Sequence, residues 1–99
     1  MLNIQKTVEN TAATFSLEGD LDTGTARELE QALMEALPGL TELTLDFAGL
    51  DYISSAGLRV LLTAQKAMEG RGSMKVRNVN EVIMEIFDVT GFTDVLTIE

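Results

Sequence analysis

The stretch "LTLDFAGLDYISSAGLRVLL", Leu43 to Leu62, contains the features that decide the fold. Apolar and polar residues alternate from Leu43 to Phe47, which is the period of a strand that buries one face. From Leu58 onward the apolar residues recur at helical spacing. Two adjacent serines, Ser54 and Ser55, stand where the strand turns into the helix. A strand that passes directly into a helix is typical of α/β folds.

The same two patterns occur on both sides of this stretch. Before it, two alternating runs precede a helical one, and after it an alternating run again precedes a helical one. The expected elements are a hairpin joined near Glu9–Asn10–Thr11, a helix from Ala26 to Leu37 that ends at Pro38–Gly39, the central strand and helix, a strand through Met74 and Val76, a helix capped by Asn80, and an edge strand in "DVLTIE".

This order of elements predicts an α/β fold with a right-handed winding, because strand–helix–strand units pair their strands in parallel. The strands carry polar residues at alternate positions, whereas strands covered on both faces are continuously apolar. We therefore expect a single domain, residues 1–99, in two layers. The sheet is predicted to be mostly parallel, with four to five strands, an antiparallel N-terminal edge strand and helices on one face.

The apolar residues of the helices and the methionines are the candidate core. In the helix after Asn80, four residues at helical spacing are expected to face the sheet, and methionine at apolar positions usually fills irregular gaps in a core. The residues concerned are Val82, Ile83, Ile86, Phe87, Met34, Met68, Met74 and Met84.

Charge and composition exclude several functions. The chain has 7 Lys and Arg against 16 Asp and Glu, a net charge of −9 that repels nucleic acid and anionic membranes. It has no cysteine or histidine, so disulfides, the usual zinc ligands and the commonest general base are missing. We expect no metal, no cofactor and no enzymatic activity. A cytoplasmic protein is expected, because no leader or membrane-length apolar run stands out. The net charge of −9 and the short chain make a monomer the default expectation.

Two loops are expected to meet at one edge of the sheet. Parallel strands place their carboxyl ends together, and ligands and partners gather at that edge in open α/β folds. The loops are "GDLDTGTA", from Gly19 to Ala26, and "AGLDYISSAG", from Ala48 to Gly57. They would bring Asp20, Asp22, Ser54 and Ser55 into one neighbourhood.

The two serines allow different chemistries. Ser54 is placed to cap the helix, which needs no further function. As a nucleophile, Ser55 would need an adjacent general base such as histidine, which the chain lacks. A nucleophile elbow would also need a glycine two residues before the serine, where this chain has Ile53. A phosphate-binding loop would need more glycine and a lysine. Phosphorylation of Ser55 remains, since a phosphate could rest at the positive end of the helix.

The quoted motifs resemble a known family. "GDLDTGTARELEQAL" together with "LTLDFAGLDYISSAGLRVLL" is similar to the STAS domain family, and within it to the anti-sigma factor antagonists. The resemblance implies that the unphosphorylated chain binds an anti-sigma factor that is also a serine kinase using ATP, which frees a sigma factor for transcription. Phosphorylation of the antagonist releases it, and a metal-dependent serine phosphatase restores it.

Carried onto this sequence, the phosphorylated serine of the family falls on Ser55. Family members often have aspartate before that serine and serine or threonine after it, whereas this chain has Ser54 and Ala56, so Ser54 is the second choice of acceptor. An alternative is a STAS domain that serves as a scaffold or as a regulatory subunit of a transporter, lipid-transport or stressosome-like assembly without phosphorylation. The expected partner contacts are Asp20, Asp22, Thr23, Asp51, Tyr52, Ser54, Ala56, Gly57 and Arg59.

Overall fold

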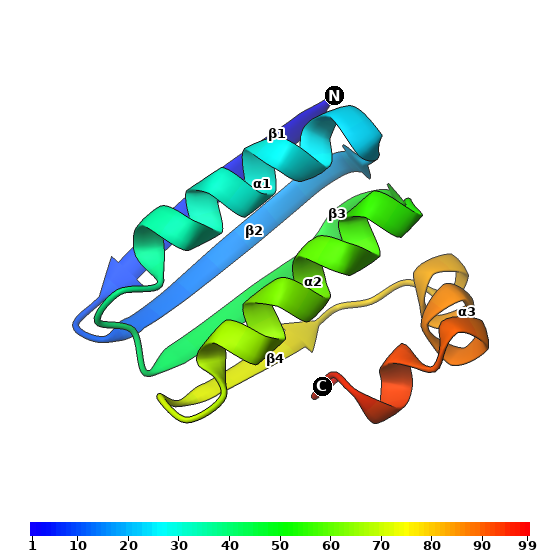
Figure 1. The fold of residues 1–99 in the computed structure, drawn as a ribbon. Helices are drawn as coiled ribbons and strands as arrows, with labels where there is room; N and C mark the ends of the chain where they lie inside the picture. The colour runs from blue at the N-terminus through cyan, green and yellow to red at the C-terminus, as the bar shows by residue number, and fades with distance from the viewer.

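Eight elements follow one another in a computed structural model that describes all 99 residues (Figure 1). The predicted hairpin, helices and parallel strands are all present. Their bounds are β1 Leu2–Glu9, β2 Ala12–Leu21, α1 Thr23–Ala36, β3 Glu42–Ile53, α2 Ser55–Met68, β4 Ser73–Arg77, α3 Glu81–Thr90 and the 3-10 turn η1 Phe92–Asp94.

The four strands lie in the order β1-β2-β3-β4. β1 is antiparallel to β2, and the hairpin between them turns at Asn10, whose φ of 58° is left-handed. β2, β3 and β4 are mutually parallel, joined by α1 and α2. The predicted mixed sheet with an antiparallel N-terminal edge is therefore confirmed.

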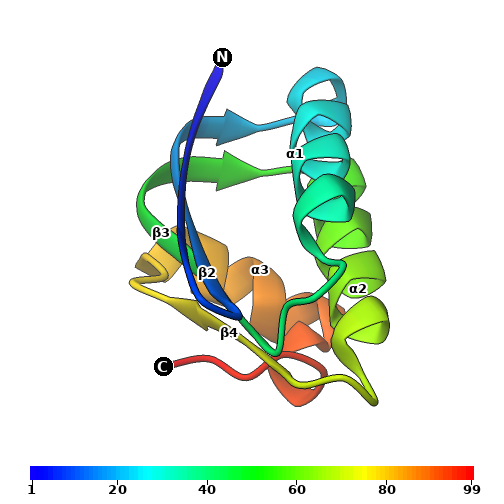
Figure 2. The same cartoon turned by 90° about the vertical axis from the view of Figure 1, so that its left-hand side faces the viewer.

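The helices cover one face of the sheet, so the molecule has two layers, as predicted. α1 and α2 lie side by side over the strands, and Figure 2 shows the sheet on one side of the molecule and these helices on the other. α3 packs against the same face of the sheet through Phe87, whose ring centroid lies 6.4 Å from that of Phe47 in β3. The opposite face of the sheet carries the polar alternate positions, among them Thr14 and Thr44, as expected for a face that no helix covers.

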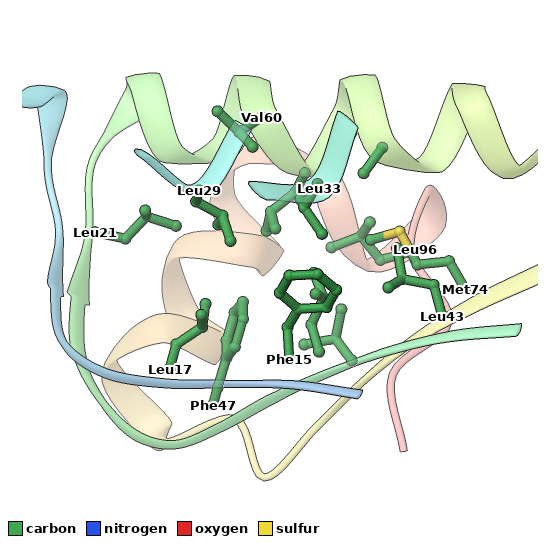
Figure 3. Close-up of a cluster of buried hydrophobic side chains, with 14 of the residues drawn as sticks. Phe15, Leu17, Leu21, Leu29, Leu33, Leu43, Phe47, Val60, Met74 and Leu96 are labelled. Atoms are coloured by element: carbon green, nitrogen blue, oxygen red, sulfur yellow. The ribbon is translucent and has the colours of Figure 1, made fainter. Parts of the chain in front are cut away.

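The core lies between these layers and contains only apolar side chains. Phe15 and Leu17 of β2 and Phe47 of β3 point toward Leu29 and Leu33 of α1 (Figure 3), and all five are almost completely buried. No polar or charged residue is buried. The polar side chains at the ends of the strands consequently lie partly or wholly at the surface.

The C-terminal residues do not form a fifth strand. Only a single bridge joins Ile98 to Val76, and Leu96 is buried beside it. The chain leaves α3 through Gly91, whose φ of 80° is left-handed, and then spends three residues on η1. The edge strand expected in "DVLTIE" is therefore reduced to this bridge, and the sheet has four strands.

Two residues expected in the core are exposed. Val82 of α3 is 59% exposed, because Ile83 and Phe87 are the residues of that helix that face the sheet. Met34 of α1 is 38% exposed, since the buried face of that helix runs through Ala26, Leu29 and Leu33. Of the remaining predicted core residues, Met68, Met74, Ile83 and Phe87 are buried, and Met84 and Ile86 are partly buried.

None of the helices combines the length and the apolar composition that crossing a lipid bilayer requires.

Candidate functional site

The register of β2 and β3 brings the two predicted loops together. Asp20 pairs with Tyr52, and Leu21 pairs with Ile53, at the carboxyl ends of the two strands. The pairing extends one residue further, because the Ser54 backbone N–H donates to the carbonyl oxygen of Leu21 at 2.8 Å. The helices α1 and α2 therefore begin next to one another, at the same edge of the sheet.

Asp22 is the N-cap of α1. Its Oδ1 accepts from the backbone N–H of Thr25 at 2.9 Å, and the Thr25 hydroxyl accepts from the Asp22 backbone N–H at 2.9 Å. That hydroxyl also donates to the carbonyl oxygen of Asp20 at 2.8 Å. The hydrogen bonds from Thr25, its backbone N–H first, lower the pKa of the Asp22 carboxyl. Asp22 thus stays charged while it orders the loop.

Ser54 is the N-cap of α2, as the sequence suggested. Its Oγ accepts from the backbone N–H of Gly57 at 3.3 Å. The side chain is partly buried, between the end of β3 and the first turn of the helix. One hydroxyl satisfies the first turn, so the neighbouring serine has no capping role left.

Ser55 is the first residue of α2 and is exposed. Its hydroxyl makes no hydrogen bond to any other group of the chain. The adjacent Ala56 is small and partly buried, and no bulky side chain follows until Leu58, which is buried. The Ser55 hydroxyl therefore stands in water at the N-terminus of a helix.

Gly57 lies beneath the serines and is buried. A Cβ added here would lie 2.8 Å from Cγ1 of Ile53 and 2.8 Å from Cγ of Leu21, which is closer than real side-chain contacts. Gly57 was expected among the partner contacts, but it is buried, and its role is structural. It allows α2 to approach the ends of β2 and β3 closely.

Most of the other expected contact residues are also at the surface. Thr23, Asp51, Tyr52 and Arg59 are exposed, with Tyr52 at 47%, and Asp20 is partly buried. Arg59 lies one helical turn beyond Ser55 on α2. These residues all belong to the carboxyl ends of β2 and β3 or to the first two turns of α1 and α2.

A shallow groove of about 230 Å³ runs between the first turns of α1 and α2. It is lined from α1 by Thr23, Ala26, Arg27 and Glu30, and from α2 by Ala56, Arg59 and Val60. The two ion pairs of the chain, Lys75–Glu99 and Arg77–Asp46, do not involve Arg27 or Arg59.

Arg27 was missed as a site residue, since it reads as part of the solvated face of its helix. Arg27 and Arg59 belong to different helices, so only the structure shows that they line one groove and that neither forms an ion pair.

A second polar cluster lies on the open face of the sheet. Asp46 accepts hydrogen bonds from the Asn78 side chain at 2.9 Å, from the Ala48 backbone N–H at 2.9 Å and from Arg77 Nε at 3.2 Å. The Asn78 hydrogen bond is the largest of the influences that lower the pKa of Asp46. The partners belong to β3, to the end of β4 and to the turn after it, so this cluster holds those segments together.

Comparisons with known proteins identify relatives of this chain and solved structures with the same fold. A family model described as "Mlab, STAS domain" matches residues 4–97. The curated protein BtrV of Bordetella bronchiseptica, whose assigned name is that of an anti-sigma factor antagonist, is 33% identical over 84 residues, 83% of this chain and 72% of that protein.

Solved structures with this fold are numerous. An anti-sigma factor antagonist from Mycobacterium paratuberculosis matches with a TM-score of 0.90 at 18% identity, over 99% of this chain and 85% of that one. The Bacillus cell fate determinant SpoIIAA in its phosphorylated form matches with a TM-score of 0.77 at 18% identity, over 98% of this chain and 91% of that one. The family model and the four-stranded mixed sheet together establish that this chain belongs to the STAS domain family.

Proposed function

We propose that this protein is an anti-sigma factor antagonist whose unphosphorylated form binds an anti-sigma factor serine kinase and thereby frees a sigma factor. It is a binding module and performs no catalysis of its own. The observation that carries the proposal is the exposed hydroxyl of Ser55, which has no hydrogen-bond partner in the chain, next to a Ser54 that already caps α2. The kinase phosphorylates Ser55 and is then released, and a metal-dependent serine phosphatase restores the binding form.

The position of Ser55 suits a phosphate acceptor. A kinase must reach the hydroxyl, and an exposed first residue of a helix meets that need. The free N–H groups and the dipole of the helix N-terminus stabilise a negative charge there, so α2 tolerates the phosphate with little rearrangement. That SpoIIAA has a phosphorylated form supports the idea that a STAS fold of this kind can carry the group.

The electrostatics of the surrounding surface convert the modification into a switch. A phosphate adds about −1.5 to −2 charges. It would join Asp20, Asp22 and Asp51 at an edge of the sheet where the nearest cation along α2 is Arg59. A partner surface fitted to a neutral hydroxyl is then repelled. A loss of about 2–3 kcal/mol of interface energy lowers affinity by roughly 30–150-fold.

Arg59 has two roles in this proposal. It lies four residues after Ser55, on the same side of the helix, and forms no ion pair. Before phosphorylation it is free to contact a carboxylate of the partner. Afterwards the phosphate on Ser55 competes for its guanidinium, so the interface loses an attraction as well as gaining a repulsion.

The test uses the Ser55→Ala variant as a trap. Because an alanine side chain offers no hydroxyl to phosphorylate, the variant should retain the kinase in the presence of ATP, whereas the wild-type protein should release it. Mass spectrometry of the wild-type protein after incubation with that kinase and ATP should place one phosphate on Ser55. The matched control is Ser54→Ala, which should still accept one phosphate. Phosphate found only on Ser54 would exclude Ser55 as the acceptor.

The alternative is a STAS domain that regulates a transporter, a lipid-transport system or another assembly without phosphorylation. The observation that favours this alternative is the capping role of Ser54, because it gives a serine at this corner a structural purpose without any modification. Under this alternative, the co-purifying partner would not phosphorylate the chain, and Ser55→Ala would bind no differently from the wild-type protein with ATP present.

A further inference from the structure

The outer face of α3 is apolar and mostly exposed. Val82 is 59% exposed and Val89 is 81% exposed, and Ile86 between them is only partly buried. The three residues are spaced i, i+4 and i+7, so they form one stripe along the helix. We call these three residues the α3 stripe. Together with Glu85 and Thr90 they line a shallow hollow of about 290 Å³.

The helix cannot rotate to bury this stripe. Ile83 and Phe87, on the other face, are completely buried, and the Phe87 ring lies 6.4 Å from Phe47 and 6.3 Å from Phe92. Asn80 fixes the start of the helix, because its Nδ2 donates to the carbonyl oxygen of Leu50 at 2.9 Å while its Oδ1 accepts from the Ile83 N–H at 2.8 Å. The exposure of the stripe is therefore a property of the folded protein.

The charges around the stripe have a single sign. The last 22 residues, from Asn78 to Glu99, contain no lysine or arginine. Glu85 lines the stripe itself, and the helix also carries Glu81 and Asp88. The nearest cation of the preceding strand, Arg77, is paired with Asp46 at 3.2 Å. The stripe is thus apolar with an acidic border.

We infer that the α3 stripe is a docking site for a basic amphipathic helix of a partner protein. Apolar residues of such a helix, spaced at one or two turns, would cover Val82, Ile86 and Val89, and its lysines or arginines would face the acidic border. A second copy of this chain would bring acidic borders together, and an anionic membrane would meet the same repulsion. The site lies outside the serine-bearing first turn of α2 and does not depend on phosphorylation.

The test is a titration of the full-length ¹⁵N-labelled chain, followed by NMR, with a synthetic peptide of about 18 residues. The peptide carries leucines at helical spacing and lysines elsewhere. One control peptide replaces its lysines with glutamates, and another replaces its leucines with serines. The expected result is a set of shifts confined to α3 and its neighbours, with the basic amphipathic peptide binding at least about tenfold more tightly than either control.

Variants distinguish binding at the α3 stripe from a general electrostatic attraction between an acidic protein and a basic peptide. The double variant Val82→Ser/Val89→Ser keeps the charge and should weaken binding about tenfold, because two valines lose their burial on docking. Glu85→Lys should weaken it as well. The matched control is Val8→Ser, since Val8 is 51% exposed on the opposite edge strand, and it should bind as the wild-type protein does.

Three results would overturn the inference. The first is unchanged affinity in the double variant, which would show that charge alone attracts the peptide. The second is a set of shifts mapping to another face of the molecule. The third is self-association through α3, seen by sedimentation and abolished in the double variant, which would make a second copy the occupant.

Discussion

Substituting each of the two adjacent serines by alanine tests the division of roles on which the proposed switch depends. Ser54→Ala removes the acceptor of the Gly57 N–H and leaves a first-turn donor to be satisfied by water. Loss of an N-cap side chain costs about 0.5–2 kcal/mol, and the 3.3 Å length of this hydrogen bond places the expected loss at about 1 kcal/mol. Ser55→Ala removes a hydroxyl without a partner in the chain, so a change within about 0.5 kcal/mol is expected.

The assay is urea unfolding of both variants and the wild-type protein, followed by circular dichroism. A shift of the midpoint with an unchanged slope isolates the change in stability. In a domain of this size, a loss of about 1 kcal/mol corresponds to a fall in melting temperature of about 4–8 °C. Wild-type stability of the Ser54→Ala variant would refute the assignment of the cap to Ser54. A loss in Ser55→Ala as large as that in Ser54→Ala would show that Ser55 has a structural role and weaken its candidacy as an acceptor.

Three further predictions concern the elements that hold the site. Gly57→Ala should destabilise the protein by about 1–2 kcal/mol in urea unfolding, because the added Cβ crowds Ile53 and Leu21 by more than the gain in helix propensity offsets. The control is Gly24→Ala, whose Cβ would lie 3.6 Å from Asp22 Oδ1. This variant should be neutral or more stable by about 0.5 kcal/mol. Asp22→Ala should lose stability at pH 7. The pKa of Asp22 is lower in the folded than in the unfolded protein, so its carboxylate contributes fully to stability above the unfolded pKa of about 3.9. This contribution is lost as the pH falls through the folded-state pKa. The free energies of unfolding of the variant and the wild-type protein should therefore converge in acid. Asn80→Ala should cost about 1–2 kcal/mol, because it removes both the cap of α3 and the hydrogen bond to β3, and undiminished stability would contradict the claim that it fixes the rotation of α3.

Several features of this protein follow from local patterns in its sequence. The alternation from Leu43 to Phe47 and the helical spacing from Leu58 determine a strand followed by a helix, and Asn80 predicts the cap of α3, because these signals act between residues close in the chain. The meeting of the two loops also follows, since parallel strands joined by crossover helices must end at one edge. The motifs around Ser55 indicated the family, which the family model confirms.

Tertiary contacts decided the rest. The sequence pattern allowed Val82 to face the sheet, but the rings of Phe47 and Phe92 hold Phe87 in place and rotate Val82 into solvent. The buried position of Gly57, against Ile53 and Leu21, follows from the packing of α2 on the ends of β2 and β3 and was not predicted from the sequence. Arg27 and Arg59 are far apart in the chain, and only the packing of α1 against α2 lines one groove with both. A helix pattern specifies which residues share a face, and its neighbours determine which face is buried.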